Sequence, residues 1–227
     1  MYYIGLDVGT SSVKALLVSQ NGEVVRSATP EYPFQTPKPM WAETDPDVWW
    51  DATQQAIRTL LEEVNPEEIA AVGLTGQMHG MVALDGKGQV LRPCIMWNDQ
   101  RSYQECEEIT SKVGESEVLK ITGNPVLAGF TAPKILWVEK NEPEMFSAID
   151  KIVLPKDYIR YKLSSEFFTD VSDASGTSLL DVGSRSWSPE MLDALGWSGQ
   201  WMPEVTESTE ATAKVSAEAF ASTGLPV

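Results

Sequence analysis

The sequence is poor in histidine, cysteine and positive charge. Its 227 residues include one histidine, two cysteines and 17 lysines and arginines, against 33 aspartates and glutamates, for a formal net charge of −16. A field of that sign repels phosphate backbones and argues against a nucleic-acid-binding protein. The acidic residues are spread along the chain, as is typical of a hydrated surface. An anionic ligand would therefore need backbone N–H groups or a metal ion at its site.

The two cysteines, Cys94 and Cys106, lack Cys-x-x-Cys spacing and companion histidines, which argues against a zinc site or a disulfide framework. No apolar run is long enough for a membrane span, and residues 1–7 lack the basic start of a signal peptide. From these features we expect a cytoplasmic protein without membrane or nucleic-acid partners.

The composition, 42% hydrophobic and 22% charged, is that of a globular protein, and the length allows one large domain. Three strands are predicted within the first thirty residues, over residues 2–8, 13–19 and 23–29. The dipeptide Asn21-Gly22 indicates a hairpin between the last two. This antiparallel start differs from the βαβ opening of a dinucleotide-binding fold and predicts an α/β protein of another kind.

A helix is predicted after Asp45, an N-cap, and Pro46, a first helical residue. Apolar residues then recur at helical spacing as far as residue 64, with Trp49 and Trp50 as core residues. Residues 69–74 suit a buried strand, and residues 81–84 and 89–91 suit a hairpin. Short strands are predicted at 94–97 and 152–154, and helices at about 101–112, 133–140, 155–163 and 189–195 and between Ser216 and Gly224.

The first candidate site is the segment D-V-G-T-S-S-V-K, residues 7–14. Asp7 leaves the end of a strand, a glycine permits a sharp turn, and three hydroxyl residues follow. Consecutive N–H groups in such a turn form an anion-binding nest, and a carboxylate beside it can hold Mg²⁺ through water. An ordinary Asp-Gly hairpin turn would also explain the segment, and the Walker spacing is absent. The phosphate-binding candidates are Gly9, Thr10, Ser11, Ser12 and Lys14, with Asp7 as the Mg²⁺ candidate.

The second candidate site, G-Q-M-H-G at residues 76–80, directly follows the predicted strand 69–74. Ligands of open α/β sheets bind at the carboxyl ends of strands. His79, the only histidine, suits either a hydrogen bond to a sugar hydroxyl or a structural role in a turn. In the third site, W-N-D-Q-R at residues 97–101, Asn98 and Asp99 can pair with vicinal hydroxyls. Trp97 offers its face to a sugar, and Asp99 also suits a helix N-cap.

Together these segments resemble the FGGY family of carbohydrate kinases. The three site segments occur in the family's order, and residues 129–141, 154–163 and 169–177 are similar to further family segments. The resemblance runs from residue 2 to the last residue. It implies an actin-like, ribonuclease H-like ATPase fold of the α/β class. In that fold a mixed five-stranded sheet has its first three strands antiparallel and carries helices on both faces.

The resemblance implies that residues 1–227 form the N-terminal, sugar-binding domain of a kinase that uses ATP and Mg²⁺. The Q-M-H-G form is similar to family members that phosphorylate the ketose D-xylulose on O5, which yields D-xylulose 5-phosphate. It implies that Asp7 lies near Mg²⁺ and that residues 10–12 lie near the phosphates. It further implies that the ketose is contacted by Gln77, Met78 and His79, with Trp97, Asn98 and Asp99 near the sugar pocket.

The family's general base is an aspartate in a Gly-Gly-Asp-like segment of a second, C-terminal ATP-binding domain, and no such segment occurs in these residues. We expect the chain to be inactive alone, because phosphoryl transfer depends on positioning across a closed cleft.

Three alternatives stay open: a kinase for ribulose or another ketose or polyol, an actin- or chaperone-like ATPase domain with protein partners, and a non-catalytic interaction module. The face toward a second domain would be apolar, so self-association, for instance as a homodimer, is expected.

Overall fold

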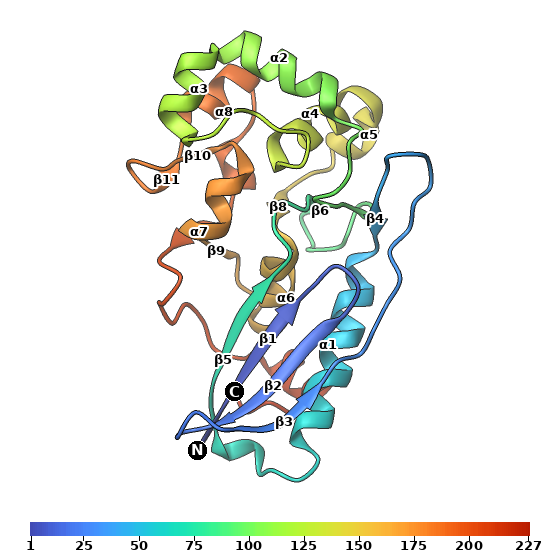
Figure 1. Ribbon diagram of the computed structural model, residues 1–227, viewed down its shortest axis with the longest axis vertical. Coiled ribbons are helices and arrows are strands. Elements are labelled where there is room, and N and C mark those ends of the chain that lie inside the picture. The colour runs from blue at the N-terminus through green and yellow to red at the C-terminus, as the bar shows by residue number, and fades with distance from the viewer.

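The structure is a computed structural model that describes residues 1–227. Its central sheet has four strands in the order β3-β2-β1-β5, seen side by side in Figure 1. They are β1 (Tyr2–Val8), β2 (Val13–Ser19), β3 (Val24–Ala28) and β5 (Ile69–Gly76). The first three are antiparallel to their neighbours, as the sequence predicts, whereas β5 runs parallel to β1. The carboxyl ends of β1 and β5 therefore lie at the same edge of the sheet.

Helices cover one face of this sheet. Alternate residues of β1 and β2 point into a core of 23 buried residues, which three helices complete. These are α1 (Pro46–Leu61), α6 (Pro155–Ser164) and α9 (Ala217–Thr223). The prediction of helices on both faces is wrong for this chain, because Tyr3 and Asp7 on the other face are exposed. The predicted burial of β5 is wrong for the same reason: Ala71 and Gly73 share that open face, where small side chains leave little apolar surface in water.

Helix α1 begins where the sequence predicts. The Asp45 side chain accepts a hydrogen bond from the Asp47 N–H, and Pro46 occupies the first turn. Trp49, Trp50 and other apolar residues at helical spacing lie buried against the sheet. The helix ends at Leu61, a turn earlier than its apolar pattern suggests. The periodic face of α1 thus fixes the layer behind β1 and β2.

The remaining strands are two or three residues long and pair outside the central sheet. The pairs are β4 (Glu43–Thr44) with β7 (Cys94–Ile95), β6 (Val82–Leu84) with β8 (Lys151–Val153), β9 (Phe168–Asp170) with β12 (Glu204–Thr206), and β10 (Leu180–Asp181) with β11 (Ser186–Trp187). The expected fifth strand of the central sheet is absent. Residues 210–215, which have no regular structure, line a cavity together with residues of β5. The predicted hairpin at 81–91 is reduced to a bridge between Leu84 and Val90.

A second core of 19 buried residues lies in a helical lobe beyond the carboxyl ends of β1 and β5 (Figure 1). Its helices are α2 (Tyr103–Val113), α3 (Glu115–Thr122), α4 (Thr131–Asn141), α5 (Pro143–Phe146) and α8 (Pro189–Leu195). Helices α2, α4 and α8 confirm the predicted ranges, whereas α3 and α5 were not predicted. The remaining helical segments are short. They are the one-turn helix α7 (Val171–Ala174) and three 3-10 turns at Pro66–Glu68, Ser175–Thr177 and Gly199–Trp201. None of the helices combines the length and the apolar character needed to cross a bilayer.

Candidate functional site

The turn between β1 and β2 presents free backbone donors. The Gly9 N–H donates to the Ser12 carbonyl at 2.9 Å, and the Ser11 carbonyl accepts from the Tyr32 N–H at 2.9 Å. The N–H groups of Thr10, Ser11 and Ser12 have no acceptor within the chain. Three consecutive unpaired N–H groups in a turn are suited to a phosphate. The turn between Asp7 and Lys14 therefore has the donors that the sequence suggested.

Asp7 and Lys14 are cross-strand neighbours in β1 and β2 and lie on the open face of the sheet. Asp7 stands apart from other metal-ligating side chains, and no group of three or more such residues forms anywhere in the structure. A lone exposed carboxylate beside a phosphate nest fits Mg²⁺ that keeps most of its water ligands, and does not fit an all-protein metal cage. Lys14 adds a positive charge next to the same nest.

Gln77 joins the turn after β1 to the loop after β5. Its backbone N–H donates to the Val8 carbonyl at 2.8 Å, and its side-chain amide donates to the Gly9 carbonyl at 3.2 Å. The third segment joins the same turn, because the Trp97 indole N–H donates to the Thr10 hydroxyl at 3.1 Å. The three candidate segments, far apart in sequence, therefore meet at one edge of the sheet.

His79 is held tightly from two sides. Its φ angle is 64°, in the left-handed region, and its ring lies 4.5 Å from the Phe130 ring between centroids. On its other side, a side chain at Gly176 would overlap the imidazole. Burial, followed by the charge of Lys134, lowers the pKa of His79 to about 4. The imidazole is therefore neutral at neutral pH and can donate or accept a hydrogen bond with a hydroxyl.

A polar cavity of about 530 Å³ opens beside Met78 and His79, at the carboxyl end of β5. Its other lining residues include Phe130, Lys156 and Asp173. Nine buried side-chain atoms in the structure lack a hydrogen-bond partner, and three of them belong to Gln77, His79 and Asn98. Of these three residues, His79 lines the cavity.

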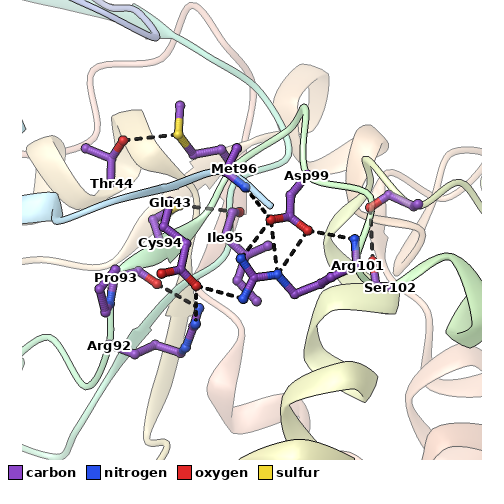
Figure 2. Close-up of polar contacts among 12 residues, drawn as sticks. Glu43, Thr44, Arg92, Pro93, Cys94, Ile95, Met96, Asp99, Arg101 and Ser102 are labelled. Atoms are coloured by element: carbon purple, nitrogen blue, oxygen red, sulfur yellow. Dashed lines mark hydrogen bonds and ion pairs between the residues drawn. The ribbon is translucent and has the colours of Figure 1, made fainter. Parts of the chain in front are cut away.

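Asp99 does not fit the predicted contact with a ligand. Its side chain is fully buried and forms a two-pronged ion pair with Arg101, with Oδ2 at 2.7 Å from Nη2 (Figure 2). Asp99 also accepts the N–H of Ala42 at 2.6 Å, and Arg101 reaches Glu43 at 2.7 Å. Nor is Asp99 a helix N-cap, because α2 begins at Tyr103. Its carboxylate is committed to holding the loop that carries Trp97 and Asn98.

A buried ionic cluster on the cavity wall was not anticipated from the sequence. The Lys156 ammonium lies 2.6 Å from Asp157, 2.8 Å from Asp170 and 3.1 Å from Asp173. Burial alone would lower the pKa of Lys156, but the carboxylates of Asp157 and Asp173 outweigh it and raise that pKa. Burial raises the pKa of Asp173 to about 6 despite the ammonium. The cluster ties α6 to β9 and α7 beneath the cavity.

Lys134 is a second buried lysine that the sequence did not single out. Its ammonium, 0% exposed in α4, donates to the carbonyls of His79 at 2.7 Å and Gly129 at 2.6 Å. No carboxylate lies within ion-pair distance of Lys134. Burial without a counter-ion lowers the pKa of Lys134 to about 7.

The depressed pKa of Lys134 predicts a stability gain with rising pH. Between about pH 7 and 10.5 the unfolded chain binds a proton on Lys134 that the folded chain has lost, so the unfolding free energy should rise with pH. The contribution of Lys134 to the slope should approach about 1.4 kcal/mol per pH unit above pH 7. The two thiols, which ionise at about pH 8.5 in the unfolded chain, also contribute to the slope in both proteins. Urea unfolding of the wild type and Lys134→Met at pH 7 and pH 9 isolates this contribution. Equal slopes in the two proteins would contradict it.

Comparisons with known proteins agree with this geometry. The model of the "FGGY family of carbohydrate kinases, N-terminal domain" matches residues 2–227. The chain is 48% identical over 210 residues to the xylulose kinase of Escherichia coli K12, which covers 92% of the chain and 43% of that protein. The crystal structure of xylulose kinase from Rhodospirillum rubrum matches with a TM-score of 0.95 and 32% identity, over 100% of this chain and 47% of that one.

The crystal structure of gluconate kinase from Lactobacillus acidophilus also matches, with a TM-score of 0.93 and 29% identity, over 99% of this chain and 46% of that one. The chain thus spans about half the length of the curated relatives it matches. The fold is that of an actin-like, ribonuclease H-like ATPase domain, with three unpaired backbone N–H groups in the turn after its first strand. The chain belongs to the FGGY family of carbohydrate kinases and corresponds to the family's N-terminal domain.

Proposed function

We propose that the chain is the N-terminal, sugar-binding half of a kinase that transfers the γ-phosphoryl group of ATP to O5 of D-xylulose. The observation that carries the proposal is the direct linkage of the Asp7 turn to the His79 loop. Gln77 donates to the carbonyls of both Val8 and Gly9 and so holds the two segments together. A phosphate on the free N–H groups of residues 10–12 would thus lie close to a ketose beside His79.

The choice of D-xylulose is supported by relatives named xylulose kinase, the first of them 48% identical over 210 residues. Met78 and Trp97, 53% and 44% exposed, offer apolar surface to the C–H face of a sugar. The neutral imidazole of His79, which lines the cavity, offers a hydrogen bond to a hydroxyl group of the sugar. A gluconate kinase shares this fold, so the fold alone does not select the ketose.

The Asp7 turn and the His79 loop have separate roles in the proposed reaction. Asp7 would hold Mg²⁺ through water, and the N–H groups of Thr10, Ser11 and Ser12 would hold the phosphates. Bound Mg²⁺ would neutralise charge on the transferred phosphoryl group. The neutral His79 would orient the ketose without acting as an acid, because its pKa of about 4 leaves it unprotonated. The general base and the adenosine contacts are proposed to come from a second domain, so the chain alone should bind ketose weakly and turn nothing over.

Ketose binding by the 227-residue chain tests this proposal. Millimolar D-xylulose should raise the melting temperature, because a ligand that binds only the folded chain stabilises it in proportion to ln(1 + [L]/Kd). D-ribulose, gluconate and glycerol are the matched ligands, and His79→Gln is the matched variant. We expect the largest shift with D-xylulose and a much smaller one in His79→Gln.

Three results would count against the proposal. A larger shift with D-ribulose or gluconate would reassign the substrate within the family. No shift with any sugar, together with a shift on adding ATP and Mg²⁺ alone, would favour an ATPase domain that acts on protein partners. Phosphorylation of D-xylulose by the 227 residues alone would contradict the proposed need for a second domain.

A further inference from the structure

Lys134 lies where three segments of the sugar site meet. Its ammonium donates to the carbonyl of His79, in the loop after β5, and to the carbonyl of Gly129, just before α4. The Thr131 hydroxyl donates to the same His79 carbonyl at 3.2 Å. Gly129 also abuts the third segment, because a side chain there would lie 2.8 Å from the Trp97 carbonyl oxygen. One side chain thus links the backbones that carry His79, Phe130 and, through Gly129, Trp97.

The environment of Lys134 argues against a purely stabilising role. The side chain is completely buried, and its hydrogen-bond partners are two neutral carbonyls. A buried charge without a counter-ion costs more than an apolar residue of the same volume, so such a group is retained where it fixes a geometry. The geometry fixed here is an unusual one, since His79 has a left-handed backbone that a side chain with a Cβ rarely adopts.

We propose that Lys134 is a positioning residue for the ketose: by tying the carbonyls of His79 and Gly129 together, it sets the orientation of the imidazole in the sugar site. The ketose part of this inference rests on the proposed function, whereas the effect on the imidazole does not. Lys134 contacts neither the cavity nor the phosphate nest. Its influence therefore passes through the backbone of His79.

The titratable groups around Lys134 allow its effect on the His79 imidazole to be followed as the pH changes. The groups that face it are His79 after β5, Cys94 of β7, and Asp99 and Arg101 in the loop after β7. Asp99 is paired with Arg101, which also forms an ion pair with Glu43, and Cys94 is fully buried with a pKa raised by burial to about 12. Lys134, with a pKa of about 7, changes charge near neutral pH, and so does Asp173, which lines the same cavity as His79 and has a pKa of about 6. Because His79 is the sole histidine, its ring nuclei give an unambiguous NMR signal.

The experiment is an NMR titration of the 227-residue chain labelled with ¹⁵N in its histidine ring, from about pH 5 to 8.5. In the wild type we expect a neutral imidazole throughout and an inflection near pH 7 as Lys134 loses its proton, separate from the titration of Asp173 near pH 6. In Lys134→Met this inflection should disappear, and the pKa of His79 should move upward because the neighbouring positive charge is gone. D-xylulose should bind Lys134→Met on the order of tenfold more weakly than wild type.

Thr131→Val is the matched control, since it removes a hydrogen bond to the same carbonyl without removing the charge. It should retain the inflection near pH 7 and the low pKa of His79. An unchanged imidazole titration and an unchanged ketose affinity in folded Lys134→Met would overturn the proposal. If that variant does not fold, the wild type decides, because a flat titration between pH 6 and 8 would overturn it too. A wild type that shows the imidazole signature but binds no ketose would support the positioning role and refute the proposed substrate.

Discussion

Asp7→Asn in the complete protein is expected to lower kcat by about 100-fold or more and to leave the ketose KM nearly unchanged. The amide keeps the size of the side chain but loses the negative charge beside the free N–H groups of residues 10–12. Magnesium and the transferred phosphoryl group would then be misplaced, and phosphoryl transfer depends almost entirely on positioning and charge stabilisation. Steady-state kinetics with both substrates varied provides the measurement.

Glu23→Gln is the matched control for Asp7→Asn, because it removes a carboxylate from the hairpin turn between β2 and β3, away from the nest. It should leave both kinetic constants within about twofold. A kcat for Asp7→Asn close to that of the wild type would contradict the assignment of Asp7. A rise in the ketose KM without a fall in kcat would instead place Asp7 against the sugar.

Lys156→Met is expected to destabilise the 227-residue chain by about 3–5 kcal/mol. The substitution removes the one positive charge among Asp157, Asp170 and Asp173, which lie 2.6 to 3.1 Å from the ammonium. The variant leaves these carboxylates buried without compensation. The loss should be smaller near pH 5 than near pH 8, because they can then take up protons. Urea unfolding at both pH values measures both effects.

Lys112→Met provides the comparison for that substitution. Lys112 forms an exposed ion pair with Glu108 one helical turn away, and the change should cost about 0.5 kcal/mol or less. In the double variant Lys156→Met/Asp173→Asn, part of the lost stability should return, since one unpaired charge is gone. Equal losses in Lys156→Met and Lys112→Met would show that the cluster does not anchor the cavity wall.

The features that the sequence predicts well depend on local patterns. The hairpin at Asn21-Gly22 and the start of α1 at Asp45 follow from turn and capping chemistry that a few residues determine. The strand β5 was located correctly but its burial was not. Its alanines and glycine read as core residues, yet they face water because no helix covers that side. The pattern of apolar residues along a strand does not reveal which face of the sheet stays exposed to solvent in the complete fold.

The features that the sequence missed depend on distant contacts. Lys134 and Lys156 occupy ordinary positions in helical patterns, and their roles arise from carbonyls and carboxylates that the fold brings to them. Asp99 shows the opposite error. Its residue type and place at a strand end suit a sugar contact, but Arg101 and the Ala42 N–H take up its carboxylate. The segments 129–141 and 154–163 resemble family segments, but their spacing alone assigns no role to either lysine.

The most direct test is a crystal structure of the complete protein with D-xylulose, Mg²⁺ and a non-hydrolysable ATP analogue. The account predicts the terminal phosphates on the N–H groups of Thr10, Ser11 and Ser12. It also predicts the ketose against His79 and Trp97, with O5 directed at the γ-phosphate. A triphosphate bound away from the Asp7 turn, or a ketose bound without contact to His79, would contradict it.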